Sequence, residues 1–178
     1  RDIAGKVLKG GENVIEVKNE QPRVEPVSPK TIPLEEPTED NVVGDYNFSG
    51  YATSPDALEL MKTIYETTPD FGSPEDIQSE IDRVMLVKNQ ANPPTSPITG
   101  DMILNSADRY GIEPRILVTL LRKETGLGTK MLTENNPGNI LNTDEGGRQE
   151  YGTIEEGVDA AAREIARRRV GGNLTINK

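Results

Sequence analysis

The chain has 178 residues, a formal net charge of −10, and no Cys, His or Trp. Without thiols and imidazoles it has no disulfide framework, no histidine-based triad and no means of building most zinc or iron sites. We therefore expect neither a metal nor a cofactor. The acidic balance argues against sequence-independent binding of nucleic acid. No apolar run approaches the length of a membrane span.

Residues 1–50 are predicted to form an extended arm. Asn13 to Lys18 alternates apolar and polar residues and is one possible strand. Prolines then recur at every third or fourth position, which is typical of a semi-extended linker without a core of its own. They are Pro22, Pro26, Pro29, Pro33 and Pro37. Because such a segment gains order by lying against another surface, we expect residues 1–45 to contact another protein chain.

Residues 51–96 are predicted to form a pair of helices. Ser54-Pro55 and Ser73-Pro74 are start signals, a Ser cap followed by Pro in the first turn. Each start is followed by apolar residues at helical spacing. The run Asn92 to Pro97 contains three prolines and predicts a domain boundary.

Residues 97–170 carry the tightest helical pattern, and residues 171–178 read as a tail. Thr99 is predicted to cap a helix that runs to about Tyr110. Residues 129–150 are rich in loop formers and could include a short hairpin. Thr153 and Glu156 have the spacing of a capping box, which starts a last amphipathic helix.

The stretch from Gly111 to Gly128 is predicted to form a short buried helix that ends on Glu124. Its apolar residues lie at helical spacing, and Glu124 continues their stripe. An apolar surrounding disfavours the charged form of a carboxyl, and a protonated carboxyl can give its proton to the leaving oxygen of a glycosidic bond. The simpler interpretation is a glutamate at a helix end that points into solvent. The stripe is formed by Ile116, Leu117, Leu120 and Leu121.

The loop that follows is rich in asparagine and contains further candidates. Asn135, Asn136 and Asn139 could hydrogen-bond the N-acetyl and hydroxyl groups of a glycan, or serve only as turn residues. A second catalytic carboxylate would have to come from the same region, although each candidate is an ordinary loop acid on its own. The candidates are Glu134, Asp144 and Glu145.

Three motifs together resemble the lysozyme-like superfamily of peptidoglycan-cleaving enzymes. They are ETGLGT at 124–129, NNPGN at 135–139, and Tyr151 before TIEEGVDAAAREI. The likeness is greatest to the lytic transglycosylase and N-acetylglucosaminidase branches, and it covers roughly Pro97 to Arg169. The resemblance implies a mainly α (α+β) fold, a lysozyme-like helical domain at 97–170 with a small loop or hairpin lobe.

The resemblance also implies the roles of individual residues. Glu124 would be the catalytic acid, and Tyr151 would line the cleft near it. Thr125 and the Asn135–Asn139 loop would bind substrate. Thr125 stands where transglycosylases commonly have Ser, and Arg148 stands where the glucosaminidase branch would have an aromatic residue.

We therefore expect cleavage of the β-1,4 glycosidic bond of peptidoglycan by a single glutamate acting as acid and base. The setting would be a larger wall-penetrating or cell-envelope assembly, either extracytoplasmic or in a phage virion or tail. The choice between hydrolysis and the lytic route that leaves an anhydro sugar stays open. The alternative function is a non-catalytic cell-wall-binding or structural component of such an assembly.

Overall fold

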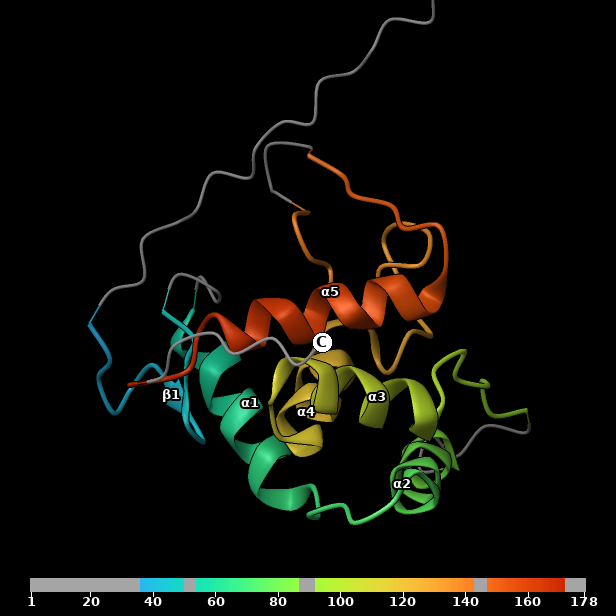
Figure 1. Cartoon of the computed structure of the whole chain (residues 1–178), viewed down its shortest axis with the longest axis horizontal. Helices are drawn as coiled ribbons and strands as arrows, with labels where there is room; N and C mark the ends of the chain where they lie inside the picture. The colour runs from blue at the N-terminus through green and yellow to red at the C-terminus, as the bar shows by residue number, and fades with distance from the viewer. Residues whose placement is uncertain (1–35, 50–53, 87–91, 143–146, 172–178) are drawn as a thin grey trace, which may run out of the picture. The chain divides into compact units, whose positions relative to one another are not determined.

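The computed structural model describes residues 36–49, 54–86, 92–142 and 147–171. These residues belong to one compact unit, Thr31–Lys178. The described part is mainly helical, which confirms the predicted fold class at that level (Figure 1). Its elements are β1 (Val42–Val43), β2 (Tyr46–Asn47), α1 (Pro55–Thr67), α2 (Pro74–Leu86), α3 (Gly100–Tyr110), α4 (Pro114–Thr125) and α5 (Ile154–Ala166).

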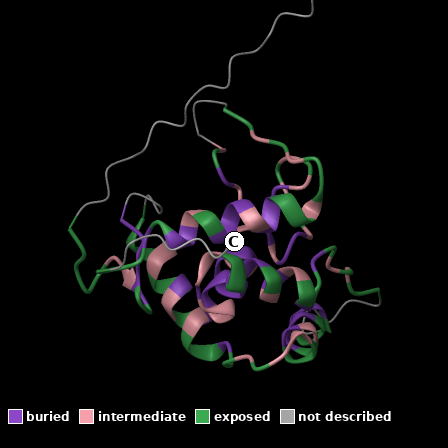
Figure 2. Cartoon of the chain, in the orientation of Figure 1, coloured by how far each residue is buried: buried purple, intermediate pink, exposed green. Residues whose placement is uncertain are grey.

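Helix α4 lies at the centre of the unit. It contacts α1, α3 and α5, so most of its surface is covered (Figure 1). The predicted apolar stripe is confirmed, but burial extends beyond it to Val118 and Thr119. Each fully buried Leu or Ile of such a helix stabilises the fold by about 1.5–3 kcal/mol. Figure 2 shows the buried residues gathered where the helices meet.

The predicted helix starts at Ser54, Thr99 and Thr153 are confirmed. Ser54, Thr99 and Thr153 cap α1, α3 and α5 by accepting a backbone N–H in the first turn. Thr153 and Glu156 form the full capping box. These caps satisfy donors that would otherwise have no partner at a helix start. At the other end, Gly111 and Gly126 take the left-handed conformation that stops α3 and α4.

The predicted boundary at Pro93-Pro94 does not separate two compact units. Helix α2 packs on α3, and α1 packs on α4. Gly100 approaches α2 so closely that a Cβ there would lie 1.9 Å from the carbonyl oxygen of Pro74. Met61 and Ile77 from one side of the prolines share a core with Leu120 from the other, each fully buried. The prolines break the chain locally, but the apolar faces on either side of them pack against one another in one core.

A small hairpin precedes the helices and corrects the prediction for the end of the arm. Strands β1 and β2 pair antiparallel, with Val43 opposite Tyr46. Val43, Tyr46 and Phe48 are at most 1% exposed. The segment around 42–48 therefore packs on its own chain instead of on another protein. In a chain so poor in aromatic residues, Tyr46 and Phe48 supply much of the apolar area that the core needs.

The possible strand at 13–18 lies outside the described residues, as does the arm up to residue 35. The short hairpin expected within 129–150 is not seen in the described part of that segment, which consists of turns and irregular backbone.

Arg168, two residues after the end of α5, hydrogen-bonds to this hairpin segment. Its guanidinium donates to the carbonyl oxygen of Ser49 at 3.1 Å and to Glu164 Oε1 at 2.8 Å. The backbone N–H of Asn47 donates in turn to the Arg168 carbonyl at 2.7 Å. Arg168 is 7% exposed, so this charged side chain is buried where the end of α5 meets the hairpin.

Candidate functional site

Glu124 lies in the last turn of α4 with its side chain 15% exposed. The ammonium of Lys123 lies 2.6 Å from its Oε1. Its Oε2 accepts a hydrogen bond from the Asn139 side-chain amide at 3.2 Å. The carboxyl is thus turned toward the loop that follows the helix, and a small part of it remains open to a ligand.

The surroundings of Glu124 differ from the apolar stripe expected from sequence. Leu120 and Leu121 are fully buried, but the stripe ends there and polar partners take over. Lys123 was not singled out in the sequence. The only signal for it is that basic residues are favoured in the last turn of a helix.

The Asn-rich loop is shaped by its own side chains. Asn136 is fully buried, and its amide oxygen accepts from Ile140 N at 2.9 Å. Its amide nitrogen donates to the carbonyl oxygens of Ile140 and Gln149 at 2.9 and 3.0 Å. We therefore assign Asn136 to loop formation, since no atom of its amide remains for a sugar.

Asn135 and Asn139 both take the left-handed backbone conformation, with φ of 56° and 50°. This conformation costs Asn less than most residues. The side chain of Asn135 donates to the Tyr151 carbonyl at 3.0 Å. Of the three asparagines, Asn139 is therefore the one whose side chain reaches Glu124.

Thr125 also lies inside. It is 1% exposed, and its hydroxyl donates to the Pro137 carbonyl at 2.7 Å and accepts from Gly128 N at 2.9 Å. Its role in this geometry is to fix the loop against the end of α4. Gly128 faces the core as well, because a Cβ there would lie 3.0 Å from Pro97 Cγ.

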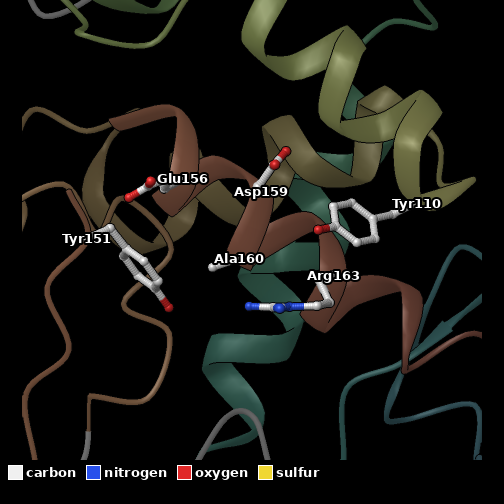
Figure 3. Close-up of a pocket in the computed structure, with 6 residues that line it drawn as sticks. All are labelled: Tyr110, Tyr151, Glu156, Asp159, Ala160 and Arg163. Atoms are coloured by element: carbon white, nitrogen blue, oxygen red, sulfur yellow. The ribbon is translucent and has the colours of Figure 1, made fainter. Parts of the chain in front are cut away.

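Tyr151 lies elsewhere. It is half-buried and lines a surface pocket with Tyr110, Glu156, Asp159, Ala160 and Arg163 (Figure 3). Glu124 is not part of that pocket. Burial raises the pKa of the Tyr151 hydroxyl, and the positive charge of Arg163 opposes that shift. The resemblance implies that Glu124 and Tyr151 line one cleft, but in this structure the two side chains have different neighbours.

Of the three candidates for a second carboxylate, the structure describes Glu134 alone. Glu134 is exposed, and its backbone carbonyl accepts from Tyr151 N at 3.4 Å. Asp144 and Glu145 lie outside the described residues. Arg148 is exposed. Within the described ranges, no group of three acidic side chains is placed to hold a metal ion.

Comparison with known proteins gave no relative. No family model, no curated protein and no solved structure matches this chain. The lysozyme-like resemblance therefore stays a prediction. Of the helices in the described ranges, none is both long and apolar enough to cross a membrane.

Proposed function

We propose that this chain cleaves the glycan strands of peptidoglycan at a β-1,4 glycosidic bond, with Glu124 as the acid and base. The observation that carries the proposal is the hydrogen bond between Asn139 and Glu124. It joins the end of the central helix to the polar loop, the two segments whose motifs resemble peptidoglycan-cleaving enzymes. The site would belong to a lysozyme-like domain acting outside the cytoplasm or within a virion or tail.

The rigid surroundings of Glu124 support this chemistry. Positioning a catalytic group contributes to rate only if its support holds it in place. Here α4 is buried along its length, and Thr125 anchors the loop at the position next to Glu124. Helix α4 fixes the backbone of Glu124, and the Asn139 amide holds one oxygen of its carboxylate. Together they determine the orientation of the carboxyl.

The ion pair with Lys123 sets a condition on the mechanism. As a general acid, Glu124 must hold a proton when the leaving oxygen arrives. The Lys123 ammonium lies 2.6 Å from Oε1, within hydrogen-bond distance, where a leaving oxygen that takes its proton from Oε1 would have to bind. The proposal therefore requires a bound glycan to displace the Lys123 ammonium, whose flexible four-carbon stem allows this.

The test is cleavage of purified peptidoglycan, followed by turbidity and by mass analysis of soluble fragments. Glu124→Gln keeps the shape and hydrogen-bonding capacity but cannot transfer a proton. We expect a loss of about 10²–10⁴-fold in rate. Glu66→Gln, an exposed glutamate of α1, is the matched control. Equal rates for wild type and Glu124→Gln would refute the role of Glu124, and the fragment masses separate hydrolysis from anhydro-sugar formation.

A second candidate function is non-catalytic binding of cell wall or a structural role in an assembly. The Lys123 and Asn139 contacts favour it, since they also suit a glutamate that merely ties a helix end to a loop. In that case wild type and Glu124→Gln would both sediment with peptidoglycan and neither would release fragments. Residues 1–45, apart from the hairpin that begins at Val42, would remain the segment predicted to contact another protein chain.

A further inference from the structure

The surface pocket at α5 is built from residues of three separate segments. Glu156, Asp159, Ala160 and Arg163 form one face of α5, while Tyr110 comes from the end of α3 and Tyr151 from the loop before α5. In Figure 3 the Arg163 guanidinium points from α5 toward the hydroxyl of Tyr151, with Tyr110 on the other side. Ala160 forms a small floor between them.

Three polar side-chain groups in this pocket have no hydrogen-bond or ion-pair partner among the described residues. The hydroxyls of Tyr110 and Tyr151 make no hydrogen bond there, and Arg163 makes no ion pair there. Both phenols and the guanidinium can donate. Arg163 is exposed and both tyrosines are half-buried, so these donors are accessible to solvent and to a ligand that enters the pocket.

The charges of the pocket cancel. Asp159 accepts from Ser106 Oγ at 2.5 Å and pairs with Arg109. Glu156 uses its Oε2 to accept from Gly152 N at 2.8 Å, which leaves Oε1 as an open acceptor. The lining thus contains two carboxylates, Glu156 and Asp159, and the guanidinium of Arg163, while Arg109 pairs with Asp159 from outside the lining. Such a balance gives no net attraction for an anion or a cation.

The ligand that fits is a neutral ring with donors and acceptors around its edge. The pocket has a volume of about 270 Å³, below the range of about 300–1,000 Å³ for drug-sized ligands. One monosaccharide is of suitable size. The C–H hydrogens of a sugar ring match the electron-rich faces of the Tyr rings. Its hydroxyls can accept from Arg163 and Tyr151 and donate to Glu156.

We propose that the pocket formed by Tyr110, Tyr151, Glu156, Asp159, Ala160 and Arg163 binds one neutral sugar unit. It shares no residue with the surroundings of Glu124. The binding is therefore independent of cleavage at Glu124, and in a cleaving enzyme it would hold the glycan at a second point. This role replaces the one that the resemblance gave to Tyr151.

The test is a titration of the full chain with N-acetylglucosamine and with its trimer, using protein labelled in the tyrosine rings for NMR. The ring signals of Tyr110 and Tyr151 should shift, while those of Tyr46 and Tyr65, which lie away from the pocket, stay in place. The trimer should bind no weaker than the monomer. Unmoved Tyr110 and Tyr151 signals with both sugars would overturn the proposal.

Variants sharpen the test. Arg163→Gln should weaken binding by about tenfold, the effect of one or two lost hydrogen bonds. Arg167→Gln, an exposed arginine one turn further on, should leave binding unchanged. Circular dichroism shows whether each variant is folded. A folded Arg163→Gln protein that binds as tightly as wild type would contradict the proposal.

Two further measurements distinguish this sugar site from an anion site and from a site that depends on Glu124. Sodium acetate should cause no shift, and a shift equal to that caused by the sugars would mean an anion site instead. Glu124→Gln should leave sugar binding at Tyr110 and Tyr151 intact even if it abolishes cleavage. Loss of binding in that variant would overturn the independence of the two sites.

Discussion

The side-chain amide of Asn139 donates to Glu124 Oε2 at 3.2 Å, although the two residues are 15 positions apart in the chain. This contact exists because Asn139 takes a left-handed conformation with φ of 50°. A β-branched residue at that position would strain the loop and remove the amide. The contact therefore links a backbone feature of the loop to the orientation of the candidate acid.

Asn139→Gly tests this link. Glycine accepts the left-handed conformation without strain, so the change removes only the amide. Loss of a hydrogen bond to a charged group costs about 1.5–3 kcal/mol, which is about 10–100-fold in rate if Asn139 positions Glu124 during cleavage. We expect kcat to fall while KM is kept. Asn135→Gly is the control, because Asn135 is also left-handed but donates to the Tyr151 backbone.

Thr125 should matter for stability through its hydroxyl. Thr125→Val keeps the shape but leaves the Pro137 carbonyl and Gly128 N–H without their partner. We expect the free energy of unfolding to drop by about 1–3 kcal/mol, measured by urea denaturation. Thr125→Ser retains the hydroxyl and should lose less. If Thr125→Val unfolds at the wild-type urea concentration, the hydroxyl is not an anchor of the loop.

Gly157 is expected to tolerate no side chain. A Cβ there would lie 1.8 Å from the carbonyl oxygen of Asn135. That oxygen belongs to the backbone and cannot turn aside, so Gly157→Ala must push the Asn-rich loop away from α5. Overpacking of this kind typically costs about 1–3 kcal/mol. Gly72→Ala, whose Cβ would meet only Asp76 Oδ2 at 3.6 Å, is the control; equal melting temperatures for the two variants would contradict this prediction.

The stability of the fold should fall in alkali because of Tyr46. Burial raises the pKa of its hydroxyl above the ordinary value of 10.0, against the opposing effects of a backbone hydrogen bond from Glu113 and the charge of Arg169. The unfolded chain therefore loses this proton first, and the folded state is penalised as the pH rises. The stabilising effect is complete below pH 10 and is lost as pH climbs through the higher folded-state pKa.

The measurement is the free energy of unfolding between neutral pH and the alkaline range. Tyr46→Phe should flatten the decline above pH 10, although it also removes the hydrogen bond that Glu113 N–H donates to the phenol at 3.2 Å. Its stability at neutral pH should therefore be lower by about 0.5–1.5 kcal/mol. Tyr110→Phe, at the surface pocket, serves for comparison. An unchanged slope in Tyr46→Phe would show that Tyr46 does not govern the alkaline transition.

The sequence by itself determined where the helices begin and end. Helices start at the caps Ser54, Thr99 and Thr153, and α3 and α4 end at Gly111 and Gly126. These effects act within one turn of the chain. It also determined the apolar face of α4, since helical spacing alone places those residues on one side. Such local rules need no knowledge of the rest of the molecule.

The tertiary structure decided which residues meet. The prolines before α3 looked like a domain boundary, but α1 packs on α4 and α2 packs on α3 across them. Asn136, Asn139 and Thr125 are of similar polarity, yet two are buried in the loop's own hydrogen bonds and one reaches Glu124. Arg168 follows α5, yet its guanidinium donates to the carbonyl oxygen of Ser49, 119 positions earlier in the chain. Hydrogen-bond partners and burial depend on segments far apart in the chain, and no local pattern of residues records how those segments approach one another.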